Sequence, residues 1–153
     1  VAMLKVHAKS RSAPLKALPA LKCLVVDNFE NQRLVGEAGG LEAVMICLQS
    51  HPHNDLVQEQ ACEALGELVV NNQANQNVSR EAGLLEAVIQ IVLGRQQMCS
   101  TVQAQALRAL GRLVAHNSPS QRLAGEAGAI EILTDGLREQ PAIDTIRELA
   151  AEA

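Results

Sequence analysis

Cysteine and histidine are the residues of this chain whose chemistry could serve redox or metal-binding roles. The 153 residues contain four cysteines, with no CxxC pair and no spacing to histidine that is typical of a zinc site. Cys47 and Cys62 lie within apolar runs of helical periodicity, and Cys23 has only Lys22 beside it. We therefore expect small, inert residues in a reducing compartment at these positions and at Cys99, with no cofactor.

The run His51-Pro-His53-Asn-Asp55 has residue types that could ligate a metal ion. Proline and asparagine in its middle are typical of a turn between two helices. Asp55 is expected to cap the helix that follows. We therefore predict a solvated loop here and no metal site.

Two pairs of charged residues have a spacing that places both members on one side of a helix. Glu63 and Glu67 are four residues apart, and Arg108 and Arg112 repeat this spacing further along the chain. The acidic pair lies off the apolar stripe formed by Val57, Ala61, Leu65 and Leu68. Such pairs predict a charged surface for recognition.

Signatures of catalysis are absent from the sequence. It contains no GxxxxGK[ST] phosphate loop, no GxGxxG, no GxSxG and no HExxH. The glycines, Gly39-Gly40 among them, fit helix corners. We therefore expect a protein without catalytic residues.

Composition narrows the class of partner. Hydrophobic residues make up 48% of the chain, yet there is no Trp, no Tyr and one Phe, and the net charge is -4. Recognition by stacked rings and binding to nucleic-acid phosphates are thereby disfavoured. The chain contains no uncharged apolar run long enough to predict a membrane span. We also expect no secretory leader, because the first ten residues mix charged and apolar side chains. We expect a protein or peptide partner and an intracellular location, cytoplasmic or nuclear.

An internal repeat determines the elements that position these residues. Three segments align without gaps, beginning at Asn31, Asn75 and Ser120, and their Glu-Ala-Gly triplets recur with periods of 44 and 45 residues. A period of this size is characteristic of a helical solenoid.

Each unit is predicted to contain three helices. A short first helix begins at an Asn or Ser cap and ends at Gly39, Gly83 or Gly128. The second helices are expected over 41–49, 84–93 and 130–137. The third helices are expected to begin at Asp55, Ser100 and Asp144, with Gln58 and Gln103 completing capping boxes at the first two.

The same phase extends over the whole chain. Residues 1–10 match the end of a second helix, and residues 13–26 match a third helix. The whole chain, 1–153, is therefore predicted to be a single array. It consists of a partial repeat (1–27), two whole repeats (28–71 and 72–116) and a second partial repeat (117–153). Both ends are apolar, whereas the ends of an array need a polar cap. Either the chain is a segment of a longer array, as its lack of an initiating Met suggests, or its ends associate with another chain.

These motifs resemble the armadillo repeat family. The resemblance rests on the NQxxVxEAGxLEAV run, on the glycine after a short first helix and on the Ala-x-x-Ala-Leu-Gly-x-Leu-Val third helix. It implies an all-α fold, a right-handed α-solenoid of stacked three-helix repeats. It also implies that the third helices line a concave groove that holds an extended peptide or a partner helix.

In the importin alpha branch of this family, a Trp and an Asn on each third helix grip the peptide. The matching positions in this chain carry neither residue: Pro19, Glu63 and Arg108 replace the Trp, and Cys23, Glu67 and Arg112 replace the Asn. The resemblance therefore argues against an import adaptor.

The resemblance places the two charged pairs in the predicted groove. Glycines beside them would let a partner's backbone approach, and one further polar residue extends each pair. The predicted partner-binding residues are Glu63, Gly66, Glu67, Asn71, Arg108, Gly111, Arg112 and His116.

An internal role for these charges remains open at this stage. The charges could instead form ion pairs between neighbouring third helices, Glu63 with Arg108 and Glu67 with Arg112, and contact no ligand. Two alternatives to a binding scaffold also stand. The array could be a spacer or self-associating segment, or it could be a regulatory domain that binds a small metabolite in a larger protein.

Overall fold

A computed structural model describes residues 1–10, 12–94, 100–131 and 133–134 of the chain. Within these ranges the regular secondary structure is entirely helical. The helices are α1 (Ala2–His7), α2 (Ala13–Val25), α3 (Phe29–Glu37), α4 (Gly40–Ser50), α5 (Asp55–Val69), α6 (Gln73–Glu81), α7 (Leu84–Leu93), α8 (Ser100–Val114) and α9 (Ser118–Glu126). The predicted all-α class is confirmed.

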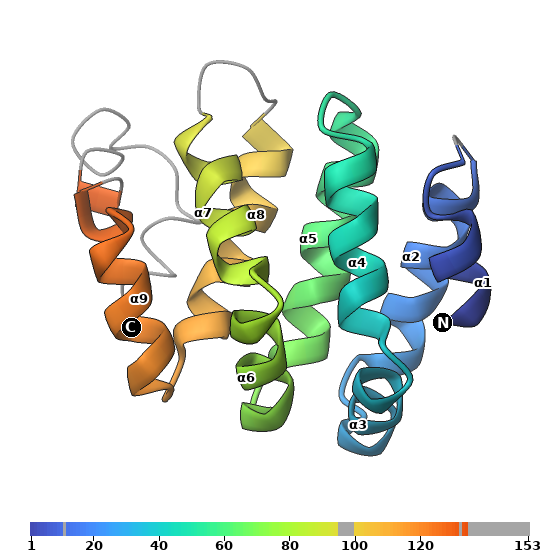
Figure 1. Ribbon diagram of the computed structural model, residues 1–153, viewed down its shortest axis with the longest axis horizontal. Helices are drawn as coiled ribbons and strands as arrows, with labels where there is room; N and C mark the ends of the chain where they lie inside the picture. The colour runs from blue at the N-terminus through green and yellow to red at the C-terminus, as the bar shows by residue number, and fades with distance from the viewer. Residues whose placement is uncertain (11, 95–99, 132, 135–153) are drawn as a thin grey trace.

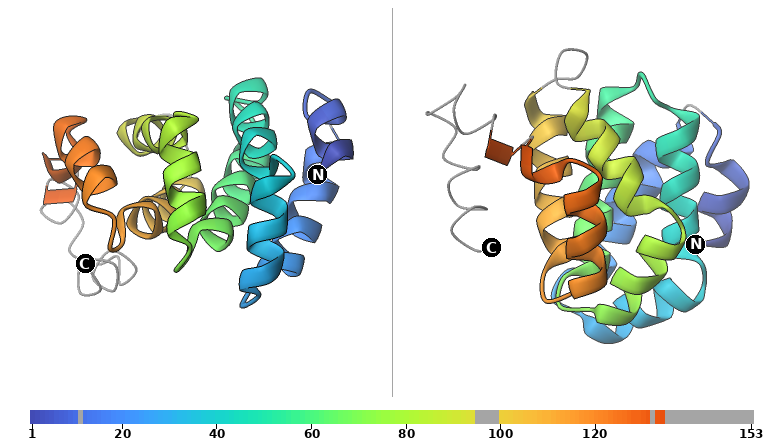
Figure 2. Two further views of the ribbon diagram at one scale, coloured as in Figure 1. Left: turned by 60° about the horizontal axis from the view of Figure 1, so that its bottom comes forward. Right: turned by 60° about the vertical axis from the view of Figure 1, so that its left-hand side comes forward.

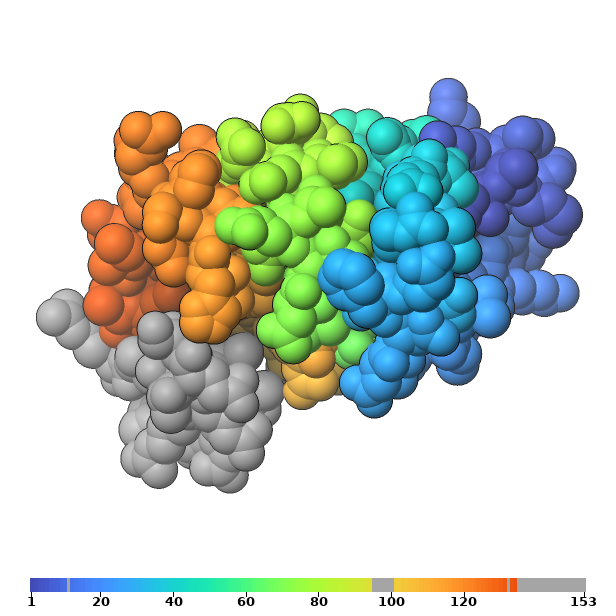
Figure 3. All heavy atoms as spheres, turned by 90° about the horizontal axis from the view of Figure 1, so that it is seen from below, coloured from blue at the N-terminus to red at the C-terminus, as the bar shows by residue number. Residues whose placement is uncertain are grey.

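The helices are arranged in rows that follow the order of the repeats. Figure 1 shows α1, α4 and α7 side by side, with α2, α5 and α8 forming a second row behind them. The short helices α3, α6 and α9 lie along one edge, which faces the viewer in the left panel of Figure 2 and in Figure 3. We call the row of α2, α5 and α8 the third-helix layer.

Glycine forms the corner between the first and second helix of each unit. Gly39, Gly83 and Gly128 have φ angles of 77, 76 and 82°. These angles lie in the left-handed region, where a residue with a Cβ is strained. The prediction that the first helices end at these glycines is confirmed.

A second left-handed corner follows each third helix, and it carries no glycine. Asp27, Asn71 and His116 occupy equivalent positions and have φ angles of 51, 53 and 53°. Asn71 and His116 were expected to continue the charged face of α5 and α8. That expectation is wrong, because α5 ends at Val69 and α8 at Val114, and both residues lie in the exposed turn beyond.

The residue after each of these corners caps the next helix. The side chains of Asn28, Asn72 and Asn117 accept hydrogen bonds from the backbone N–H three residues on, at 2.9 to 3.1 Å. These caps lie three residues before the repeated segments that begin at Asn31, Asn75 and Ser120. They satisfy N–H groups that the helix itself leaves unpaired.

The predicted cap of α5 also needs correction. Asn54, not Asp55, is the N-cap, and its side chain accepts from the N–H of Val57 at 3.2 Å. Gln58 does not complete a capping box, because it is buried and donates to the carbonyls of Leu48 and His51. The side chain of Ser100, the helix expected at Asp144 and Cys99 lie outside the described residues.

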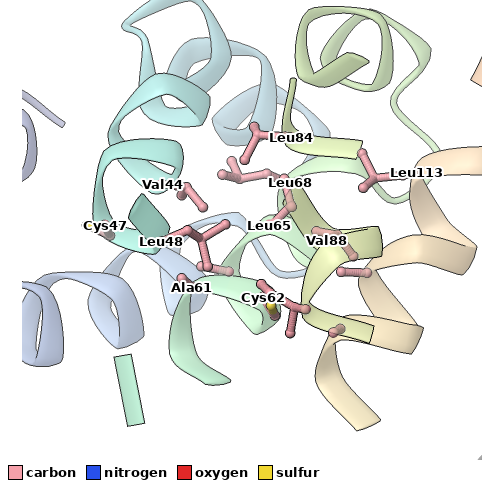
Figure 4. Packing of buried hydrophobic residues seen from close by; sticks show 14 of the residues in the cluster. Val44, Cys47, Leu48, Ala61, Cys62, Leu65, Leu68, Leu84, Val88 and Leu113 are labelled. Carbon is pink, nitrogen blue, oxygen red and sulfur yellow. The ribbon is translucent and has the colours of Figure 1, made fainter. Parts of the chain in front are cut away.

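The core lies between the helix rows. All four residues of the predicted stripe on α5, Val57, Ala61, Leu65 and Leu68, are fully buried. In Figure 4, Leu65 and Leu68 lie beside Val44 of α4 and near Leu84 of α7. Since burial of a leucine side chain contributes roughly 1.5 to 3 kcal/mol, packing of this aliphatic stripe is a main source of stability.

A network of buried amides joins consecutive units. The Asn75 side chain donates to two carbonyls of the preceding unit, that of Leu68 in its third helix, at 2.8 Å, and that of Gln32 in its first helix, at 3.0 Å. Gln76 donates to the carbonyls of Arg112 and Ala115. These side chains stabilise the stacking of units by satisfying carbonyls at helix ends.

Candidate partner-binding surface

An acidic stripe runs along α5 in the third-helix layer. Asp55, Glu59, Glu63 and Glu67 follow one another at intervals of four residues, so they share one side of the helix. Basic residues are absent from α5, whereas α2 and α8 contain basic residues and no acidic ones. The sequence predicted the Glu63 and Glu67 pair; Asp55 and Glu59 extend it.

The C-terminal end of this stripe, Glu67, is paired with an arginine of α8. The Arg112 guanidinium contacts the Glu67 carboxylate at 2.5 Å, and both side chains are largely buried. Arg112 crosses Gly66 on its way, since a Cβ placed on Gly66 would lie 3.2 Å from Arg112 Nη1. Gly66 is buried, so the space left by its missing side chain admits this arginine and not a partner's backbone.

The middle of the stripe is paired to α2 and not to α8. Lys22 Nζ donates to Glu63 Oε1 at 2.9 Å. This hydrogen bond raises the pKa of Lys22, against the lowering effect of burial. The alternative pairing of Glu63 with Arg108 is therefore wrong, and the pairing of Glu67 with Arg112 is right.

Lys22 is a site residue that sequence reasoning missed. It occupies the repeat position held by Gly66 in the next unit and by Gly111 in the one after. The sequence did contain a signal for it, because this repeat position carries lysine in the first unit and glycine in the other two. Across the third-helix layer, α2 is thus basic, α5 acidic and α8 basic. The ion pairs Lys22–Glu63 and Glu67–Arg112 join α5 to its two neighbours.

Arg108 differs from the other charged residues of the layer. Its side chain is exposed, and it forms no ion pair or hydrogen bond within the part of the chain that the structure describes. It lies on α8 one turn before Arg112, beside the half-buried Gly111. Of the two arginines, Arg108 alone offers a guanidinium to an outside group.

The described cysteines and His51 lie in surroundings that fit roles in packing and in holding a loop. Burial raises the pKa of the Cys47 thiol to about 11 and that of Cys62 to about 12, while Cys23 is exposed on α2. His51 Nε2 donates to the carbonyl of Ala8 at 2.8 Å, which ties the loop to the preceding unit. Among the described residues there is no cluster of three His, Cys, Asp or Glu side chains able to hold a metal.

Helix length and hydropathy bear on membrane insertion. None of the helices in the described ranges has an apolar stretch long enough to cross a bilayer.

Comparison with known proteins identifies a similar fold without a family. No family model and no curated protein matches the chain. A crystal structure of an engineered protein from the Northeast Structural Genomics Consortium superimposes with a TM-score of 0.81 at 22% identity. The match covers 98% of this chain and 60% of the engineered one. At this identity the likeness concerns the fold alone.

Proposed function

We propose that this protein is a non-catalytic, armadillo-type α-solenoid that binds a segment of another protein on its third-helix layer. The repeated unit supports the solenoid, because the glycine corner, the left-handed turn and the Asn cap recur at the same positions in successive units. Such arrays present extended surfaces that are used for protein recognition.

One observation carries the binding proposal: among the described residues Arg108 has no internal partner, whereas the neighbouring Arg112, Glu67, Lys22 and Glu63 are held in ion pairs. The pairs Lys22 with Glu63 and Arg112 with Glu67 fix their own side chains. A partner therefore gains most from a carboxylate directed at Arg108, where no internal bond has to break first. A guanidinium and a carboxylate form the stronger class of charge-assisted hydrogen bond.

The acidic end of the stripe adds a second requirement. Asp55 is exposed, and the Glu59 carboxylate accepts a hydroxyl hydrogen bond from Thr101, at 3.2 Å, with no cation paired to it among the described residues. A partner segment with an acidic residue near Arg108 and a basic residue near Asp55 would complement both ends of the surface. Complementary charges of this kind determine orientation and specificity more than affinity.

The experiment selects partners without assuming their sequence. A phage-displayed library of short random peptides is panned against the full chain, and the enriched peptides are measured by fluorescence polarisation. We expect enriched peptides to carry an acidic residue and to lose about tenfold or more in affinity to the Arg108→Glu variant. Raising the salt concentration weakens the same complexes.

The control matches the substitution at a distant arginine. Arg122 on α9 is strongly exposed, so Arg122→Glu makes the same charge change away from the third-helix layer. Arg108→Glu is preferred to reversal of Glu63 and Glu67, because reversal would leave Lys22 and Arg112 facing like charges. Equal loss of affinity in both arginine variants, or no enrichment of peptides, would contradict the proposal.

A further inference from the structure

One side of α2 in the third-helix layer is apolar. Leu15, Pro19 and Cys23 follow one another at intervals of four residues, so they share one side of the helix, and Val26 continues it at the C-cap. Leu15 and Pro19 are half-buried, Cys23 is exposed and Val26 is 42% exposed. We call these four residues the apolar strip.

The strip occupies repeat positions that stay on the surface in the complete units. Its equivalents along α5 and α8 are partly or fully exposed without exception: Glu59, Glu63, Glu67, Val70, Ala104, Arg108, Arg112 and Ala115. Because α5 packs between two other third helices, the exposure of these positions does not depend on an open end of the array. The strip is therefore part of the same surface as the acidic stripe and Arg108.

Three equivalent residues form a row across this surface. Pro19, Glu63 and Arg108 occupy one repeat position on α2, α5 and α8. The middle of the row is already paired, because Glu63 accepts a hydrogen bond from Lys22. Arg108 has no partner within the part of the chain that the structure describes. The row thus offers an apolar contact at one end and a guanidinium at the other.

Pro19 also changes the main chain of α2. It lies inside the helix and has no N–H, so it cannot donate to the carbonyl of Leu15 four residues earlier, as other helical residues do. A carbonyl without its helical donor gains from an outside N–H group. An extended segment has free main-chain N–H groups, whereas those inside a helix are already bonded. The strip therefore favours an extended partner segment.

The stacking of the helices determines the spacing within that segment. Packed helices lie up to about 10 Å apart, so two steps from α2 to α8 span roughly 20 Å. An extended chain rises about 3.3 Å per residue and crosses this distance in about six residues.

From these observations we propose that the partner segment is extended and crosses the third-helix layer. It places an apolar side chain on the strip, at Pro19 and Cys23, and a carboxylate on Arg108 about six residues away. One of its main-chain N–H groups donates to the carbonyl of Leu15. This assignment rests on the proposed function, because it takes Arg108 as the anchor for the carboxylate.

The probes are Ser/Gly peptides of about fifteen residues, acetylated and amidated, that contain one Leu and one Glu. The two are separated by three, six or nine residues, in both orders, so the composition is constant. Each peptide is titrated into the full chain labelled with ¹⁵N, up to roughly millimolar concentration. We expect a peptide with the six-residue separation to shift the Arg108 side-chain Nε–H and the Cys23 amide together. It should bind about fivefold or more tightly than the peptides with other separations.

Two variants of α2 test the apolar end of the row. Cys23→Glu introduces the residue that α5 carries at this repeat position, and it should remove the preference for the six-residue separation while the Arg108 shift remains. Pro19→Ala supplies the missing N–H and a better helix former, so it should fold and weaken the same peptide about threefold or more. Leu34→Asp on α3, where the side chain is 48% exposed, is the control and should leave the affinity unchanged.

The outcomes separate this inference from the proposed function. Equal affinity at all three separations, or a Cys23 amide that stays in place while Arg108 shifts, would overturn the inference and leave binding at Arg108 intact. Unchanged affinity in both Cys23→Glu and Pro19→Ala would do the same. If none of the peptides shifts Arg108, the proposed function is contradicted together with the inference.

Discussion

Among single residues, the buried cysteines link the packing of the core to a measurable pH dependence. Cys62 is enclosed by apolar side chains of α5 and its neighbours, and the thiolate would be unsolvated there. The folded protein therefore holds the proton of Cys62 up to about pH 12, whereas a thiol in the unfolded chain loses it near pH 9.0.

This difference predicts a loss of stability in alkali. The contribution is complete below pH 9, and it falls as pH rises towards 12, because the unfolded state then binds fewer protons than the folded state. Each such thiol removes about 1.4 kcal/mol from the free energy of unfolding per pH unit within that window. Urea unfolding of the full chain at pH 8 and pH 10 measures the slope.

The variant Cys62→Ala should be less stable at pH 8 and should show a shallower decline towards pH 10. Val69→Ala provides the control, since Val69 is fully buried in the same helix and cannot ionise. It should lower stability equally at both pH values, by about 1 to 3 kcal/mol. An unchanged slope in Cys62→Ala would mean that water reaches this thiol.

Residue identity alone could predict some of the site and not the rest. The spacing of Glu63 and Glu67 was sufficient to place both on one side of a helix. Arg112 was among the partners that the spacing suggested for Glu67, whereas Lys22 was not predictable as the partner of Glu63, because which neighbouring helix a side chain reaches depends on how the helices stack. Arg108 and Arg112 look equivalent in sequence, yet only Arg112 lies over Gly66 and reaches a carboxylate.

At the level of elements, the corners between helices were predicted better than the caps. Glycine at Gly39, Gly83 and Gly128 is a strong signal, because few other residues accept these φ angles. The caps Asn28, Asn72 and Asn117 lie outside the most similar part of the repeat, so the helix starts were placed three residues late. The left-handed Asn71 and His116 carry no such signal and were assigned to the helices.

The glycine corner supports a prediction about Gly83. It has a φ of 76°, and a Cβ there would meet only Met45 Cε, at an ordinary 3.7 Å. Gly83→Ala should therefore cost about 1 to 2 kcal/mol of unfolding free energy through backbone strain alone. Thermal or urea unfolding of the variant measures this cost.

Gly94 is the matched control for that substitution. It ends α7 with a φ of -70°, and a Cβ there would make contacts of 3.5 Å. Gly94→Ala should change stability by less than about 1 kcal/mol, or raise it slightly by restricting the unfolded chain. A similar loss in both variants would show that the left-handed angle of Gly83 does not set the cost.

For the whole molecule, the array has unequal neighbours along its length. The third helix α5 packs between α2 and α8, whereas α2 has a third helix on one side and an exposed face on the other. In proteins built of repeats, stability is close to a sum over units and their nearest-neighbour contacts. The unit at 1–27 should therefore open more readily than the unit at 28–71.

Native-state hydrogen exchange tests this expectation at equivalent positions. The amides of residues 17–24 in α2 and 61–68 in α5 have matching places in their helices, so their intrinsic surroundings are similar apart from the missing neighbour. We expect exchange at least about tenfold faster in α2, reflecting local opening below the global free energy of unfolding. Equal rates in the two segments would mean that the units open together, and the exposed apolar face would then carry no cost in stability.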